Sequence, residues 1–299
     1  MRRAAPLMLL VALAAGCGQS GDSGGGPRVV ATTTQVADLV RNVAGHRVRV
    51  TRILVPGADP HDYEPRPSDA RALTEARVVF RSGGGIDGWL DELVESAGSG
   101  APVVTLIDSV HRTGGDPHWW QDPRNAELAV GAIREALSRA DPSGARTYRR
   151  RAAAYTARLR RLDRGIARCM AEVPVAKRKL VTTHDSLGYF ARRYRVKVVG
   201  AVIPSLSTQA QPSGRETERL VDQVREEGVE AIFPESPVNP RLERALAREA
   251  GVGAGDRLWG DSLGPPGSDG ATYLGAMASE TAAMVKGMSG GRRSCRPRV

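Results

Sequence analysis

The sequence is poor in the residues that cross-link a chain or bind metals through sulfur. Its 299 residues include three cysteines, too few for a disulfide-rich scaffold or a zinc ribbon with thiolate ligands. No internal repeat is evident, which argues against a solenoid. Histidine is also scarce, with five residues. Apolar residues make up 41% and charged residues 25%, a composition that is typical of a globular protein with a buried core and argues against wholesale disorder.

The first residues read as an export signal that is too short to span a bilayer. Arg2 and Arg3 precede an apolar stretch that ends at Ala15, so residues 1–16 are predicted to be a signal peptide. The segment Leu13-Ala14-Ala15-Gly16-Cys17 resembles the lipobox of bacterial lipoproteins, in which the cysteine is lipidated; an ordinary secretory signal with a chance cysteine is the alternative. Residues 17–27 are then a lipidated Cys17 with a flexible tether.

An exported chain works in a compartment where disulfides persist. We therefore expect an extracytoplasmic protein anchored by its lipid to the outer face of the bacterial cell membrane, where functions that need ATP or NAD are disfavoured. Cys169 and Cys295 are the cysteines left after lipidation of Cys17. They can form a disulfide or remain as two thiols, and both alternatives stay open.

The chain is strongly basic, with a formal net charge of +10. Such a charge is consistent with an anionic partner such as nucleic acid or a membrane, but a general bias toward arginine is the simpler interpretation, and no nucleic-acid partner is expected. The arginines between 146 and 168 are predicted to be spread around a solvated helix, with contact to anionic lipid as a second interpretation.

Apolar runs and helix signals alternate along most of the chain. Strands are predicted at residues 29–31, 48–55, 78–80, 103–107, 180–183, 196–202 and 229–233. Helices are predicted at 34–44, from a cap at Ser68 to Ala76, at 87–97, after Asp122-Pro123, at 186–194, from Ser213 to Glu227, from Asn239-Pro240 to Gly251, and at 272–288. This alternation predicts parallel sheets covered by helices on both faces, an α/β fold.

The pattern changes between residues 143 and 173, which lack a strand signal and predict one long helix. We therefore expect two parallel-sheet lobes, residues 28–142 and 174–289, joined by one long rigid helix over 143–173 and followed by a basic tail, 290–299. A cleft between two such lobes, at the carboxyl ends of their strands, is a natural ligand site.

Three histidines and one aspartate follow predicted strands or precede predicted helices. His61 lies in VPGADPHDYEP, His118 in DPHWWQDP, His184 in TTHD and Asp261 in WGDSLG. A lone loop histidine is usually a solvated side chain, but two Asp-Pro-His triplets and a third strand-end histidine form a pattern. Imidazole and carboxylate together suit a borderline divalent transition metal.

These segments, with IFPESPVNPRLERALAREAG and LWGDSLGPPGSDGATYL, resemble the cluster A-I (ZnuA/TroA-like) family of zinc and manganese solute-binding lipoproteins, from about residue 28 to 289. The resemblance implies metal ligands at His61, His118, His184 and Asp261 in the cleft between the lobes. It also implies a monomer that binds Zn²⁺ as its transported ligand and passes it to an ABC membrane permease with a cytoplasmic ATPase.

The residue at the third ligand position, His184, bears on which metal is bound. Members of the family with His there tend to bind zinc and those with Glu manganese, so His184 favours Zn²⁺, with Mn²⁺ or Fe²⁺ as the alternative. The His-rich loop of many zinc members is missing, and His111 and His46 are expected to be surface residues. Glu235 is predicted to orient an imidazole N–H beside the metal; Asp59, Asp116 and Asp185 either do the same or form turns and caps.

Other functions remain to be weighed. Gly83-Gly84-Gly85-Ile86-Asp87-Gly88 fits the dinucleotide-binding pattern G-x-G-x-x-G, although a tight turn is the simpler interpretation. Three histidines also suit an exported zinc hydrolase, but the sequence lacks H-E-x-x-H, and Asp261 would fill the position that water needs. A structural adhesin, which would require no metal, is a third alternative. The expectation is therefore a binding protein without enzymatic activity.

Overall fold

The structure, a computed structural model, describes residues 26–299. The predicted signal peptide 1–16 and the predicted lipidation residue Cys17 lie outside the described residues, as does most of the tether 17–27. Within the described range, no helix is long and apolar enough to cross a bilayer.

The first lobe is built on a parallel sheet in the order β2-β1-β3-β4. The strands are β1 (Arg28–Ala31), β2 (Arg49–Arg52), β3 (Val78–Arg81) and β4 (Val103–Thr105), and the helices are α1 (Thr34–Ala44), α2 (Pro67–Thr74), α3 (Trp89–Ser96) and α4 (Pro123–Ala140). Side chains alternate between the faces of the sheet. Val29 and Phe80 therefore pack toward α1 and α4, whereas Val30 and Val79 pack with apolar residues of α2 and α3.

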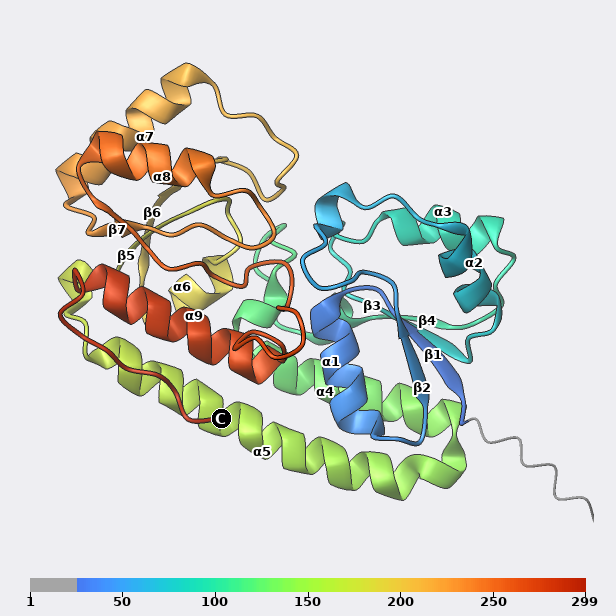
Figure 1. Ribbon diagram of the computed structural model, residues 1–299. Coiled ribbons are helices and arrows are strands. Elements are labelled where there is room, and N and C mark those ends of the chain that lie inside the picture. Colours follow the sequence, from blue (N-terminus) through green and yellow to red (C-terminus); the bar gives the residue numbers. More distant parts are fainter. Residues whose placement is uncertain (1–25) are drawn as a thin grey trace, which may run out of the picture.

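The second lobe contains two parallel pairs, β5 (Lys179–Thr182) with β6 (Lys197–Ala201) and β7 (Ala231–Ile232) with β8 (Gly253–Ala254). An isolated bridge between Thr182 and Phe233 joins the pairs. The helices are α6 (Gly188–Tyr194), α7 (Gly214–Glu227), α8 (Arg241–Ala250) and α9 (Tyr273–Met288). Val181 and Ile232 pack with α7 and α8 on one face, and α9 lies on the other side, against α5 (Figure 1).

Helix α5 (Ala145–Ala171) runs beneath both lobes (Figure 1). Its 27 residues correspond to a length of about 40 Å. Helix α5 ends shortly before Pro174, a residue that cannot continue a helix. One face is buried, with Tyr148, Tyr155, Leu159, Leu162 and Ile166 in the main core.

The arginines of this helix are not distributed as predicted. They were predicted to be spread around it, but the burial of one face leaves them on the remaining surface, where all except the half-buried Arg151 are exposed: Arg146, Arg149, Arg150, Arg158, Arg160, Arg161, Arg164 and Arg168. Where the interior face is apolar, the charged residues collect on the solvent face.

Several predicted element bounds also differ, among them the three that follow. The strand predicted at 103–107 ends at Thr105, and a 3₁₀ turn, η2 (Leu106–Ser109), follows, in which the N–H of Val110 donates to Ile107 O at 3.4 Å. The strand predicted at 48–55 is shorter in the structure, where β2 covers Arg49–Arg52. Helix α2 begins at Pro67 with Arg66 rather than Ser68 as its cap, because Asp69 Oδ2 accepts the N–H of Arg66 at 2.8 Å.

Candidate metal centre

His61 is presented by a short 3₁₀ turn, η1 (Pro60–Asp62), in the loop after β2. Asp59 caps this turn, since its Oδ1 accepts the N–H of His61 at 3.0 Å. Its second oxygen accepts the hydroxyl of Thr208 at 2.7 Å, which links this loop to the second lobe. Asp59 therefore has the turn-forming role, and both of its oxygens have partners other than an imidazole.

His118 precedes the 3₁₀ turn η3 (Trp119–Gln121) and is fully buried. Asp116 Oδ1 accepts the backbone N–H of His118 at 2.9 Å and lies 2.7 Å from its Nδ1. The carboxylate holds the ring with Nδ1 as the donor, which leaves Nε2 as a lone-pair donor for a metal. Asp116 thus has the imidazole-orienting role that the sequence left open.

His184 follows β5 at the carboxyl end of the strand. Glu235 Oε1 accepts the backbone N–H of His184 at 3.0 Å, and Oε2 lies 3.4 Å from its Nδ1. Ser186 donates its hydroxyl to Oε2 at 2.5 Å. Glu235 is buried. It holds the backbone of His184 and places a carboxylate beside the ring, whose Nδ1 has no hydrogen bond of acceptable geometry among residues 26–299.

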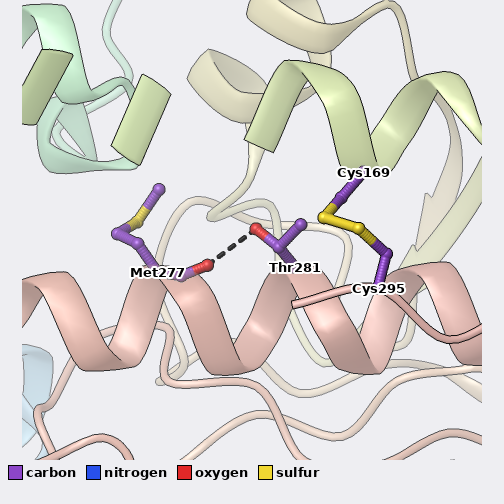
Figure 2. Close-up of a disulfide and its surroundings, with 4 residues drawn as sticks. All are labelled: Cys169, Met277, Thr281 and Cys295. Carbon is purple, nitrogen blue, oxygen red and sulfur yellow. Dashed lines mark hydrogen bonds between the residues drawn. A yellow bond between two sulfur atoms is a disulfide. The ribbon is translucent and has the colours of Figure 1, made fainter. Parts of the chain in front are cut away.

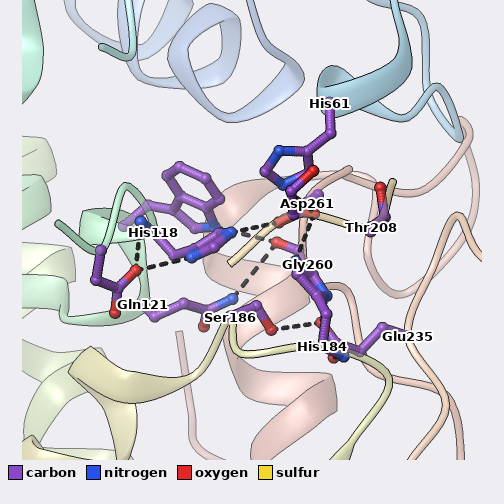
Figure 3. A network of polar contacts seen from close by, with 12 residues as sticks. His61, His118, Gln121, His184, Ser186, Thr208, Glu235, Gly260 and Asp261 are labelled. Carbon is purple, nitrogen blue, oxygen red and sulfur yellow. Dashed lines mark hydrogen bonds and ion pairs between the residues drawn. The ribbon is translucent and has the colours of Figure 1, made fainter. Parts of the chain in front are cut away.

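Asp261 completes the group (Figure 3). Its carboxylate oxygens lie 3.2 Å from Nε2 of His61, 3.4 Å from Nε2 of His118 and 3.0 Å from Nε2 of His184. One donor atom from each of the four residues lies within 4.8 Å of the others. The structure therefore brings together four side chains that are separated by up to two hundred residues in the sequence.

The donor atoms of this cluster are buried but unused. None of the three Nε2 atoms and neither oxygen of Asp261 has a hydrogen-bond partner of acceptable geometry among residues 26–299. Buried polar atoms normally find partners because desolvation without a hydrogen bond is costly. A cation at their centre would satisfy all of them at once.

The cluster has strongly perturbed electrostatics. Burial would lower the pKa of His184, but Asp261 and Glu235 beside it outweigh burial and raise the pKa well above its ordinary value. Burial would likewise raise the pKa of Asp261, but the charges of His184 and His118 hold this pKa well below its ordinary value. The free protein therefore keeps a proton on the imidazole where a bound cation would sit.

The distances from Asp261 to the three imidazoles fit a four-coordinate transition metal, and the four donor atoms together lie within 4.8 Å of one another. Ligand atoms of a tetrahedral zinc complex with bonds of about 2.05 Å lie about 3.3 Å apart, and the nitrogen–oxygen distances to Asp261 are 3.0–3.4 Å. Three imidazoles and one carboxylate match the donor types that zinc takes in proteins. The arrangement is thus suited to binding one divalent cation.

A cavity of about 470 Å³ lies beside His61 and is lined by residues of both lobes, among them Tyr63, Trp89 and Ser207. The side chain of His61 is 7% exposed, whereas those of the other three are at most 1% exposed. The cavity is therefore the side from which an ion can reach the cluster.

Several other candidate residues lie apart from the cluster. His46 and His111 are exposed, as expected. Asp185 is next to His184, but no hydrogen bond of its side chain is found among the described residues. The first three glycines of the dinucleotide-like motif, Gly83 to Gly85, have positive φ angles. They form a turn that closes on Asp87, whose oxygens accept the N–H groups of Ser82 and Gly83 at 2.7 and 3.0 Å. A carboxylate therefore occupies the place that a phosphate would need.

Three residues around the carbonyl of Gly260, which directly precedes Asp261, were not predicted from the sequence. Gln35, Trp120 and Gln121 all donate to this oxygen, and Figure 3 shows Gln121 directed toward Gly260. Trp120 and Gln121 are the second and third residues after His118, and this proximity was the one available signal. Nothing in the sequence relates Gln35, in α1, to residue 260.

Comparisons with known proteins give a consistent result. The family model of the periplasmic zinc-uptake complex component A (ZnuA) matches residues 29–287. The manganese-binding lipoprotein MntA of Halalkalibacterium halodurans is 31% identical over 292 residues, covering 95% of this chain and 97% of that protein. MntA of Bacillus subtilis is 33% identical over 262 residues, with 83% and 85% covered.

The fold has a close counterpart among solved structures. The periplasmic zinc-binding protein TroA from Treponema pallidum matches with a TM-score of 0.82 at 27% identity, covering 88% of this chain and 99% of that one. The predicted fold class, α/β with parallel sheets in two lobes, is confirmed by this match.

Proposed function

This chain belongs to the family of periplasmic zinc-uptake components, and we propose that it captures Zn²⁺ outside the cytoplasm and delivers it to the membrane permease of an ABC transporter. The coarser function, a metal-binding solute-binding protein of such a transporter, follows from the family. The finer proposal names the ion, the ligands His61, His118, His184 and Asp261, and a partner permease driven by a cytoplasmic ATPase. The protein acts as a monomer.

The observation that carries this proposal is the set of buried donor atoms without partners. Three neutral imidazoles and one carboxylate suit zinc, whereas manganese sites usually contain more oxygen ligands. An ion enters beside His61 through the cavity of about 470 Å³ and displaces the proton from His184. The deciding experiment is elemental analysis of the protein purified from its native membrane, in which we expect one zinc per chain; a chain loaded with another metal would contradict the choice of zinc.

Manganese is the second candidate, because both MntA relatives are named as manganese-binding. The second oxygen of Asp261 is also free to bind, which would supply the additional oxygen that Mn²⁺ prefers. Competition titration with Zn²⁺ and Mn²⁺ separates the two, and Fe²⁺ is tested in the same titration. A preference for Mn²⁺ over Zn²⁺ would favour the manganese alternative.

A zinc hydrolase is a lower-ranked alternative. It requires a metal-bound water, and Asp261 lies at the position that this water would occupy. We therefore expect no hydrolysis of ester or peptide substrates by the zinc-loaded protein, and hydrolysis above that of the metal-free protein would favour the enzyme.

The proposed location follows from the first residues of the chain. Lipidation of Cys17 would anchor the protein to the outer face of the cell membrane, with the tether to residue 27 leading to β1. The relatives MntA are named as lipoproteins, which supports this part of the proposal.

Replacing Asp116 with alanine is expected to lower the affinity for Zn²⁺ by about 10- to 100-fold, the usual effect of losing a carboxylate that orients a metal-binding histidine. Its Oδ1 holds both the ring and the backbone of His118. Competitive titration against a chelator measures the change. Asp185→Ala removes a neighbouring aspartate on the other lobe and is the matched control; equal losses in both variants would contradict an orienting role for Asp116.

The affinity for Zn²⁺ is expected to fall as the pH is lowered, by up to about tenfold per pH unit for the one proton that the ion displaces. Asp261 and Glu235 raise the pKa of His184 well above its ordinary value, so the loss begins above the pH at which a free histidine titrates. Asp261 stays ionised because its pKa is lowered. Chelator competition between about pH 5 and 8 measures the slope, and a flat profile would contradict proton displacement.

A further inference from the structure

The segment that carries Asp261 crosses from one lobe to the other. At Leu258 it is still part of the second lobe, since the N–H of Ser236 donates to Leu258 O at 2.8 Å and the N–H of Leu258 donates to Pro234 O at 2.9 Å. Four residues later its contacts are with the first lobe, where the hydroxyl of Ser262 accepts the N–H of Gly57 at 2.8 Å.

A second hydrogen bond fixes the far side of Asp261 to the first lobe, because the N–H of Leu263 donates to the hydroxyl of Thr34 at 2.8 Å. Asp261 thus belongs to the second lobe by sequence but lies in a loop that the first lobe holds.

The carbonyl of Gly260 is the centre of these contacts. Trp120 Nε1 donates to it at 3.1 Å, and the side-chain amides of Gln35 and Gln121 donate to it at 3.4 Å each. All three donors are buried. A carbonyl oxygen has two lone pairs, so three donors from two separate segments of the first lobe are more than satisfaction of this oxygen requires.

Gly260 itself cannot make the backbone of this loop rigid. A Cβ at this position would lie 2.3 Å from Oε2 of Glu235, the carboxylate that holds His184, so only glycine fits. Glycine has the least restricted backbone of all residues. The direction of the neighbouring Asp261 carboxylate must therefore be fixed by contacts from outside the loop.

The hydrogen bond from Gln121 to Gly260 is accompanied by a loss of folding stability. Its Nε2 donates to Gly260, but its Oε1 is buried and has no hydrogen-bond partner among the described residues. A buried acceptor without a partner destabilises the fold. An apolar side chain of the same size would avoid this penalty, so the amide group serves something other than folding.

We infer that Gln35, Trp120 and Gln121 are positioning residues for the metal site, which grip the carbonyl of Gly260 and thereby fix the carboxylate of Asp261 toward the three imidazoles. The inference rests on the proposed function, because it assigns these residues to the same metal site. It makes the second and third residues after His118 part of the site, together with a glutamine of α1.

Gln121→Met tests the inference, since methionine is close to glutamine in size and removes both the donated hydrogen bond and the unpartnered oxygen. We expect the affinity for Zn²⁺ to fall by about tenfold, as for other residues that orient a metal ligand. We also expect the visible absorption of bound Co²⁺ to change, because the Asp261 oxygen moves relative to the imidazoles. The thermal midpoint of the metal-free protein should stay the same or rise. Gln223→Met, in α7 on the surface, is the matched control.

The outcomes separate the inference from the proposed function. If the unsubstituted protein binds neither Zn²⁺ nor Co²⁺, the proposed function fails. If it binds both and Gln121→Met has the affinity and Co²⁺ spectrum of the control, the positioning role is overturned. A lower thermal midpoint of the metal-free variant together with an unchanged Co²⁺ spectrum would leave Gln121 a structural residue and would also overturn it. Gln35→Met provides a second, independent variant with the same expected result.

Discussion

The affinity for Zn²⁺ is expected to fall by at least about 100-fold when His118 is replaced with alanine. Loss of a residue that only orients a ligand costs up to about that factor, and this substitution removes the proposed ligand itself. His118 is fully buried, and its Nε2 lies 3.4 Å from Asp261. Water cannot replace the imidazole equally well, because three protein groups would remain where four are needed for a closed site.

The measurement is competitive titration of the purified protein against a chelator of known affinity. Circular dichroism of the metal-free variant should retain the α/β spectrum, because the substitution leaves the residues of the apolar clusters unchanged. His46→Ala, at an exposed position, serves as the control and should bind like the unsubstituted protein. An unchanged affinity of His118→Ala would remove the basis for the proposed ligand set.

Loss of the Cys169–Cys295 disulfide is expected to lower the free energy of unfolding by roughly 5 kcal/mol. The structure joins these two sulfurs across a sequence separation of 126 residues (Figure 2), which answers the question that the sequence left open. The value comes from the chain entropy that such a loop withholds from the unfolded state. The bond ties the C-terminal tail to α5, where Cys295 packs against the main core.

Thermal unfolding of the double variant Cys169→Ala/Cys295→Ala tests this expectation. The midpoint should fall by on the order of 10 °C, whereas the affinity for Zn²⁺ should not change, because neither cysteine belongs to the cluster. A reductant should lower the midpoint of the unsubstituted protein and leave that of the double variant as it is. Equal midpoints for the two proteins would show that the cross-link does not stabilise the fold.

Local signals in the sequence predicted most of the elements. Helix α7 begins at Gly214 after Ser213 and Glu216, which form the expected capping box, and α4 begins at Pro123 with Asp122 as its cap. Such signals work because the groups that satisfy a helix end lie within a few residues of it. They do not show where a strand gives way to a turn: Leu106 and Ile107 were predicted to continue a strand and lie in a 3₁₀ turn instead.

The group of four side chains could be anticipated for a related reason. Parallel strands end at the same edge of a sheet, so His61 and His184, which follow strands, were expected to face one cleft. The scarcity of histidine made their placement informative. The choice between Asp116 and Asp185 as the orienting carboxylate could not be made in this way, because each lies within two residues of a histidine in sequence and only the turn geometry brings Asp116 to Nδ1 of His118.

The sequence by itself determined which elements form and which donor types are offered to a metal, because periodicity, caps and loop residues act over short distances along the chain. Only the tertiary structure decided that the loop of Asp261 is held by the first lobe, that three buried donors converge on Gly260, and that Cys169 meets Cys295. These contacts join residues more than a hundred positions apart. Their energies depend on distance and direction in space, and local sequence patterns carry no record of either.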